Sequence, residues 1–270
     1  MERNKVAKNC KSVFLDNGVE ITYTEFGEEN EEIIISSAIY IHTWSPVLEE
    51  LGKKYHVYGF IMRLENDIET NWSRQWGQDL YDFCRALGIE RFHYIGKCHS
   101  VIPGWFMAKE HPDMIQSFCS FYLVPHTEPM DDNSWMTIQK EEGMPALMKR
   151  AMRKASSLPI KMQELQTVGI ENGFTPAFAK YGSCPEYIWD SKEELEEFMR
   201  TTEVPVCLMF GTDDILFHDH YSSNIKAMMN LNRARTVVLQ GERHLMEIDA
   251  PKKIAFEQDA FINWVKLGDC

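Results

Sequence analysis

The chain has 270 residues, of which 44% are hydrophobic and 26% are charged, a composition typical of a globular protein with room for one large α/β domain and an insertion. Its net charge of −13 disfavours nucleic acids and membranes as partners, and no run of about 18 apolar residues predicts a transmembrane helix. The seven cysteines follow no disulfide or zinc-ligand spacing. With an N-terminus unlike a signal peptide, they predict reduced thiols, a cytoplasmic location and no metal site.

The first third of the chain alternates between strand and helix patterns. Residues 12–15 and 19–26 flank Asn17-Gly18, and such a dipeptide between two strand-like runs is a strong signal for a hairpin. Buried strands are predicted from residues 33 and 55, with a helix around residues 48–54 between them. Strands that alternate with helices predict a mostly parallel, doubly wound sheet.

The most informative stretch is residues 96–100 (GKCHS), which follows a strand pattern over residues 92–95 and opens a helix pattern over residues 99–111. Such a small–x–nucleophile–x–small pentapeptide is typical of a nucleophile elbow, where a tight turn forces the central side chain outward. The central residue is Cys98, where serine is usual. Considered alone, the pentapeptide also fits a cysteine that packs as a small hydrophobic residue. Pro103 predicts a kink in the helix.

Two later strand patterns place an acid and a histidine after this nucleophile. Residues 204–210 run into Asp213 and Asp214, and residues 236–239 end shortly before His244. The order nucleophile, acid, histidine, with the last two each just after a strand, is the triad order of the α/β-hydrolase fold.

The motifs together resemble those of the α/β-hydrolase superfamily, in its capped branch of esterases, lactonases and carbon–carbon hydrolases. The matching residues are Asp79-Leu80, Leu87-Gly88-Ile89, Ala108, His111-Pro112, Asp113, Gly211, Asp214, His244, Asp249 and Pro251. The resemblance implies an α/β-hydrolase fold with a helical cap inserted before the acid-bearing strand. The expected domains are a first part of the core at residues 1–125, the cap at 126–202, and a second part of the core at 203–270.

The resemblance also implies a catalytic triad of Cys98, His244 and Asp214. Asp214 is preferred over Asp213 because it occupies the fourth position of the family's GxxD motif. Cys98 would attack a carbonyl carbon as a thiolate, His244 would take its proton, and Asp214 would hold the imidazole. The backbone N–H of His99 is one expected oxyanion donor, while its side chain is expected to point away.

The second oxyanion donor is Ala38 by family position. Its loop reads Ser36-Ser37-Ala38 where the family usually shows His-Gly, so a serine hydroxyl either contributes to the site or satisfies the turn backbone. Lys97 either favours a nearby anion or points at solvent.

Substrate contacts are predicted for His42 and Trp44, which follow the oxyanion loop, and for Trp135 in the cap. The alternative for Trp44 is that it packs in the core and does not contact substrate. The pair His218 and His220 is interpreted as a surface feature rather than as metal ligands.

A cysteine nucleophile favours substrates with good leaving groups, because a thiolate is itself readily expelled from a tetrahedral intermediate. The leading hypothesis is therefore a cofactor-independent hydrolase of an activated ester or enol lactone of a small hydrophobic or aromatic compound. It would act through an acyl-cysteine, and its nucleophile is similar to that of dienelactone hydrolases. One alternative is a Cys-dependent acyltransferase or thioesterase, and another is a non-catalytic ligand-binding protein. Dimers are common in the family, so a homodimer is also compatible with the resemblance.

Overall fold

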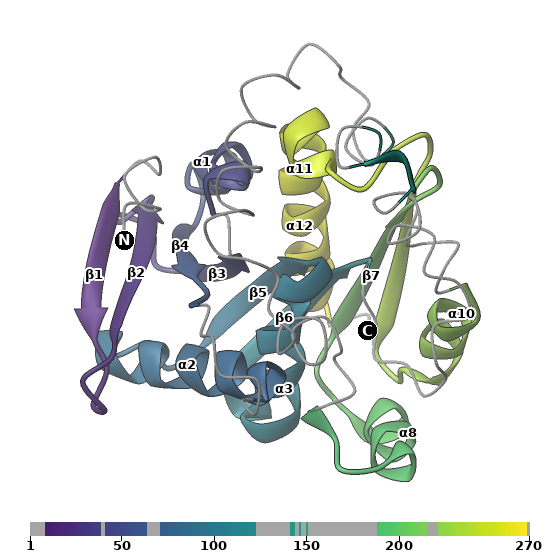
Figure 1. Cartoon of the computed structure of the whole chain (residues 1–270), viewed down its shortest axis with the longest axis horizontal. Coiled ribbons are helices and arrows are strands. Elements are labelled where there is room, and N and C mark those ends of the chain that lie inside the picture. The colour runs from purple at the N-terminus through teal and green to yellow at the C-terminus, as the bar shows by residue number, and fades with distance from the viewer. Residues whose placement is uncertain are drawn as a thin grey trace.

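The computed structural model describes residues 9–38, 41–63, 71–122, 141–143, 146, 150, 188–214 and 221–268. An eight-stranded sheet in the order β1-β2-β4-β3-β5-β6-β7-β8 forms its centre (Figure 1). The strands are β1 (Cys10–Phe14), β2 (Glu20–Phe26), β3 (Ile33–Ala38), β4 (His56–Ile61), β5 (Phe92–Lys97), β6 (Ile115–Phe121), β7 (Val206–Gly211) and β8 (Ala234–Leu239). The β1–β2 and β2–β4 pairs are antiparallel, and the others in this sheet are parallel. This confirms the predicted mostly parallel sheet.

Helices cover both faces of the sheet (Figure 1). They are α1 (Ser45–Leu51), α2 (Trp72–Leu87), α3 (Ile102–Glu110), α8 (Lys192–Thr201), α10 (Tyr221–Asn230), α11 (Met246–Asp249) and α12 (Pro251–Lys266), with short 3₁₀ turns η2 (Ile41–Thr43), η3 (Cys98–Val101) and η4 (Pro112–Met114). Helix α1 packs beside α12, and α2 packs beside α3. No helix in the described ranges is long and apolar enough to cross a membrane.

The N-terminal hairpin forms where the Asn-Gly signal predicted it. Gly18 adopts φ 81°, a left-handed conformation that glycine reaches without a Cβ penalty. The Leu15 N–H donates to Val19 O at 2.8 Å, and the Gly18 N–H donates to Leu15 O at 2.9 Å. The turn sets the register of β1 on β2, so that Phe14 lies opposite Glu20.

Helix α2 begins and ends at residues that suit those positions. The Asn71 side chain accepts a hydrogen bond from the Arg74 N–H, and Gly88 ends the helix at φ 67°, as a left-handed C-terminal glycine does. Within this helix, the buried Asp79 carboxylate accepts from Arg63 Nε at 2.6 Å and from Arg63 Nη2 at 3.0 Å. This bidentate pair fixes the end of β4 against α2.

The helix after the elbow is divided rather than kinked. Residues of η3 form a 3₁₀ turn, and α3 begins at Ile102 with Pro103 in its first turn. The first N–H groups of a helix have no intrahelical acceptor, so a proline there loses no hydrogen bond. The predicted kink is therefore replaced by a new helix start.

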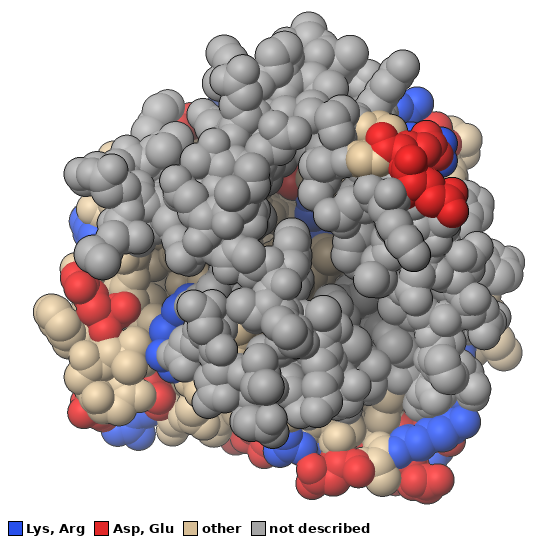
Figure 2. All heavy atoms as spheres, in the orientation of Figure 1, with Lys and Arg blue, Asp and Glu red and all other residues tan. Residues whose placement is uncertain are grey.

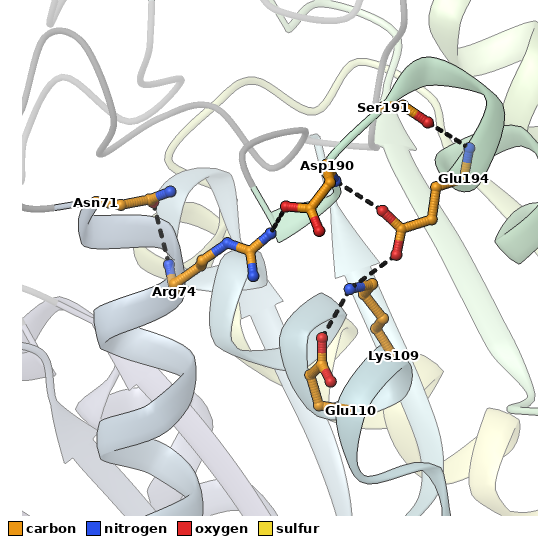
Figure 3. Close-up of polar contacts among 7 residues, drawn as sticks. All are labelled: Asn71, Arg74, Lys109, Glu110, Asp190, Ser191 and Glu194. Carbon is orange, nitrogen blue, oxygen red and sulfur yellow. Dashed lines mark hydrogen bonds and ion pairs between the residues drawn. The ribbon is translucent and has the colours of Figure 1, made fainter.

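Residues 188–191 lead into α8. Arg74 Nη2 of α2 donates to Asp190 at 2.6 Å, and Lys109 of α3 lies 3.0 Å from Glu194 of α8 (Figure 3). These contacts form a polar bridge between α2, α3 and the start of α8. Most of the expected cap at residues 126–202 lies outside the described residues, so that domain division stays a prediction.

Charged side chains of both signs occupy the described surface in Figure 2. Acidic and basic groups are interspersed along the lower edge of this view (Figure 2). This part of the surface therefore carries no single large patch of positive charge.

Candidate active site

The turn between β5 and η3 holds Cys98 in a conformation that side chains rarely adopt. Its φ is 53°, and a left-handed residue other than glycine is uncommon and often occurs at a functional site. A Cβ added at Gly96 would lie 2.3 Å from Ser100 O. The turn therefore requires glycine there, which is the physical basis of the small residues in the pentapeptide.

A hydrogen-bond network holds the turn closed. The Ser100 hydroxyl accepts from the Lys97 N–H at 2.7 Å and donates to Lys97 O at 2.7 Å. The carbonyl of Ser100 accepts from Tyr94 OH at 2.6 Å and from Ser37 Oγ at 3.2 Å, and the two hydroxyl oxygens are in close contact with each other. Of the two roles predicted for the serine hydroxyls, Ser37 takes the second, because it satisfies the backbone of the turn.

Asp214 and His244 meet at the carboxyl end of β7. His244 Nδ1 lies 2.8 Å from Asp214 Oδ2, and the aspartate side chain is fully buried. Asp213 is exposed, and its Oδ1 accepts from Thr212 Oγ1 at 3.0 Å. Of the two candidate acids, Asp214 is the one that contacts the imidazole.

Gly211 is the glycine that lets the histidine loop approach β7. A Cβ at this position would lie 2.3 Å from Glu242 O and 2.4 Å from the Tyr122 hydroxyl oxygen. Any larger residue at Gly211 would displace the backbone just before His244, so the first position of the GxxD motif has a steric explanation.

The Cys98 thiol and the His244 imidazole perturb each other. Burial raises the pKa of Cys98, but hydrogen bonds from His244 and His99, with their charges, outweigh burial and bring that pKa well below its usual range. Burial lowers the pKa of His244, but the Asp214 charge and hydrogen bonds to Asp214 and Cys98 raise it to about 9. At neutral pH these shifts favour a thiolate–imidazolium pair.

The His99 ring lies beside α2, with its centroid 6.2 Å from that of Trp76, and His99 contributes to the lowered pKa of Cys98. The expectation that its side chain points away from the site stays a prediction. Its backbone N–H remains the first predicted oxyanion donor.

Ala38 is the last residue of β3 and is 5% exposed. Strand β3 pairs with β5 and also contacts η3, so Ala38 ends on the side of the sheet where Cys98 lies. Its role as the second oxyanion donor stays a prediction.

Tyr122 and Glu247 were not recognised as part of the site from the sequence. Tyr122 follows β6 at φ 65°, its hydroxyl donates to Arg243 O at 3.1 Å, and its ring centroid lies 5.3 Å from that of His244. Lys97 is buried and donates to Glu247 Oε1 at 2.6 Å. Of its two predicted roles, it therefore contacts an anion and does not point at solvent. No motif in the sequence singles out Tyr122 or Glu247 as a residue of the site.

Of the predicted substrate contacts, the structure describes the side chain of Trp44 alone. Trp44 is 2% exposed and packs edge-on against Phe121 with ring centroids 6.2 Å apart, so its packing alternative fits the structure. The His42 side chain, Trp135 and the segment with His218 and His220 lie outside the described residues.

A separate cleft of about 550 Å³ lies on the outer side of α2 and α3. It is lined by Asn71, Arg74, Gln75, Gln78, Phe106, Glu110 and His111. None of the candidate triad residues lines it, so it is not the substrate site implied by Cys98. In the described part of the chain, no cluster of His, Cys, Asp and Glu side chains could hold a metal ion.

Comparison with solved structures identifies the fold. A meta-cleavage product hydrolase from Pseudomonas fluorescens is 18% identical with a TM-score of 0.75, covering 94% of this chain and 97% of that one. An enol-lactonase from Burkholderia xenovorans is 19% identical with a TM-score of 0.68, covering 94% and 100%. A naproxen esterase from Bacillus subtilis is 17% identical with a TM-score of 0.71, covering 96% and 94%. The chain therefore has the α/β-hydrolase fold.

Comparisons of the sequence alone found no match. No protein-family model matches the chain, and no curated protein matches it.

Proposed function

We propose that this protein is a cofactor-independent hydrolase of an activated ester or enol lactone, with Cys98, His244 and Asp214 as its catalytic triad. The observation that carries the proposal is the left-handed Cys98, whose pKa is lowered by His244, together with the 2.8 Å contact between His244 and the buried Asp214. A strained nucleophile, a base and an orienting carboxylate in one chain of contacts fit covalent catalysis.

The first half of the reaction forms an acyl-cysteine. The Cys98 thiolate attacks the carbonyl carbon, and the developing oxyanion is stabilised by the N–H groups of His99 and Ala38. When the tetrahedral intermediate collapses, the His244 imidazolium donates its proton to the leaving oxygen. Because the resting pair is already charged, no proton has to leave the thiol during the attack.

The second half of the reaction releases the acid. Neutral His244 takes a proton from water as the water attacks the thioester, and the second intermediate expels the Cys98 thiolate. Asp214 stabilises the imidazolium that this step restores. The triad thus returns to its starting protonation state after one turnover.

The nucleophile restricts the substrate class. In the first intermediate, the thiolate is expelled backwards unless the substrate's own leaving group is comparably stable or becomes protonated. Enolates and phenolates are stable enough to leave without a proton, whereas simple alkoxides and amide nitrogens depend entirely on protonation by His244 and are therefore disfavoured. Fold neighbours that are named as an enol-lactonase and an esterase are compatible with this choice.

The test is intact-protein mass spectrometry during turnover of an aryl ester. We expect a burst of phenol and an acyl adduct in the wild type, and neither in Cys98→Ala. Cys10→Ala removes an exposed cysteine and serves as the control, with an unchanged adduct. Faster adduct loss on addition of an amine or thiol acceptor would favour an acyltransferase. No adduct with any activated ester or lactone would contradict covalent catalysis and favour a ligand-binding protein.

A further inference from the structure

A buried ion pair joins the two backbone segments that carry the nucleophile and the histidine. Lys97, the residue before Cys98, is 7% exposed, and Glu247, three residues after His244, is 1% exposed. Lys97 Nζ donates to Glu247 Oε1 at 2.6 Å and to His244 O at 3.1 Å. One ammonium group therefore holds both the histidine backbone and the start of α11 (Met246–Asp249).

Stability alone gives a weak reason for this arrangement. Taking two charges out of water costs several kcal/mol per ion. Apolar residues of similar volume often give the folded protein equal or greater stability than a buried ion pair does. Within the described residues, Glu247 Oε2 also has no hydrogen-bond partner, so the contact with Lys97 carries much of the compensation for this carboxylate. An ion pair that is costly to bury and lies against the triad points to a role in the site.

We propose that Lys97 and Glu247 are positioning residues, which hold the His244 backbone on the elbow and, as opposite fixed charges, set how tightly the imidazole holds its proton. The proposal rests on the proposed role of His244, and it adds two residues that act through the triad without touching substrate.

The Cys98–His244 pair is surrounded by titratable and charged groups from several elements. They are Lys97 of β5, His99 of η3, Tyr122 after β6, Asp214 after β7, Glu242, which is paired with Lys253 at 3.2 Å, and Glu247 of α11. Asp214 stabilises the imidazolium, and the charge of Lys97 opposes it.

The two members of the pair should therefore shift the protonation of His244 in opposite directions. In Lys97→Met the repulsion of the imidazolium is lost, so the imidazolium should persist to higher pH. In Glu247→Gln the ammonium of Lys97 is no longer balanced, so the imidazolium should lose its proton at lower pH. A role confined to packing would not produce shifts of opposite sign.

The experiment measures alkylation of Cys98 by iodoacetate and by iodoacetamide across pH, using intact-protein mass spectrometry. Both reagents need the thiolate, but only the anionic reagent is attracted by the imidazolium. The ratio of the two rates therefore falls as His244 loses its proton, and its midpoint reports that event. We expect this midpoint to move up by about one pH unit in Lys97→Met and down by about one unit in Glu247→Gln, the order of shift that a neighbouring buried charge produces.

Two further variants control the experiment. Lys97→Arg keeps the charge and should keep the midpoint within a few tenths of a unit of the wild type. Lys53→Met breaks an exposed ion pair with the same N–O distance of 2.6 Å, to Glu50, and should leave the midpoint unchanged.

Shifts of the same sign in both charge-removing variants, or no shift in folded Glu247→Gln, would overturn the proposal. If Lys97→Met fails to fold, Glu247→Gln decides alone, because a downward midpoint supports the proposal and an unchanged or raised one refutes it. The readout needs no substrate, so absence of ester turnover would count against the proposed hydrolase and leave this inference standing.

Discussion

Cys98 differs chemically from the buried cysteines of the same sheet and helices because imidazoles contact it. Burial raises the pKa of Cys84 and of Cys119, which lie in the core as small apolar side chains. At Cys98 the contacts of His244 and His99 reverse that effect. The same residue type thus meets opposite electrostatic conditions at these positions, which supports the proposed role of Cys98 over its packing alternative.

The assignment of Asp214 as the acid of the triad leads to a prediction. Asp214→Asn removes the charge that stabilises the His244 imidazolium, and we expect kcat/KM for an aryl ester to fall by about 10⁴-fold, as it does when the carboxylate of a Ser-His-Asp triad is neutralised. The pKa of His244 should fall toward its usual value, because the carboxylate charge that raises it is lost.

Asp213→Asn is the matched control, since it neutralises the neighbouring exposed carboxylate. It should change kcat/KM by less than about three-fold, as surface substitutions commonly do. A greater loss in Asp213→Asn than in Asp214→Asn would reverse the assignment of the acid.

At the scale of elements, two kinds of contact hold the start of α8 against α2 and α3. The polar bridge of Figure 3 is largely exposed, with side-chain exposures of 39% for Arg74 and 82% for Asp190. Close beside Asp190, Trp189 is 5% exposed, and its ring centroid lies 5.2 Å from that of Phe198 of α8, whose own centroid lies 6.4 Å from that of Trp105 of α3. Exposed ion pairs contribute little to stability, whereas a buried aromatic ring contributes several kcal/mol.

We therefore expect the apolar contact to dominate at this junction. Trp189→Ala should lower the free energy of unfolding by about 3 kcal/mol, and Asp190→Asn by less than about 1 kcal/mol. Denaturant titration of both variants would measure the difference, with Arg74→Gln combined with Asp190→Asn to give the coupling of the pair. Equal losses in the two single variants would contradict this ranking.

The elbow region shows how far an element could be predicted from local pattern. The pentapeptide predicted a strand, a tight turn and a helix, because its small residues are needed wherever backbone passes close to backbone. The division of the helix into η3 and α3 could not be predicted in the same way, since Pro103 permits both a kink and a new helix start. Packing around the turn, with Ser37 and Tyr94 bonded to Ser100, selects the second.

For the whole molecule, a buried polar cluster links the amino ends of three central strands. His93 is 2% exposed, and its Nδ1 lies 2.7 Å from Ser117 Oγ while its Nε2 lies 2.9 Å from Glu32 Oε1. Glu32 is also 2.6 Å from Lys266 near the end of α12. Burial lowers the pKa of His93, although Glu32 opposes this.

This cluster predicts a loss of stability on acidification. A histidine whose pKa is lower in the folded state binds protons more readily when unfolded, so its contribution is complete above its unfolded pKa of about 6.5 and is lost as pH falls below it. One such group changes the free energy of unfolding by at most about 1.4 kcal/mol per pH unit. We expect His93→Gln to flatten the decline in stability between pH 7.5 and 5.5.

Urea titrations of wild type and His93→Gln at several pH values would measure the two slopes. Other histidines also titrate in this window, so the difference between the slopes is the informative quantity. Identical slopes would show that His93 does not contribute.

The sequence by itself determined the features that depend on neighbouring residues in the chain. The Asn-Gly hairpin, the alternation of strands and helices, and the glycine required at the elbow all follow from local geometry, which a short stretch of residues specifies. The order of nucleophile, acid and histidine likewise predicted which residues would converge, because parallel strands bring their carboxyl ends to one edge of the sheet.

Only the tertiary structure decided which side chains meet across that edge. It selected Asp214 over Asp213 as the partner of His244, and it paired Lys97 with Glu247. The last two residues are 150 positions apart, and no local pattern specifies such a contact. It depends on the order of strands in the sheet and on close packing at Gly211, which together set where the histidine loop lies on the elbow.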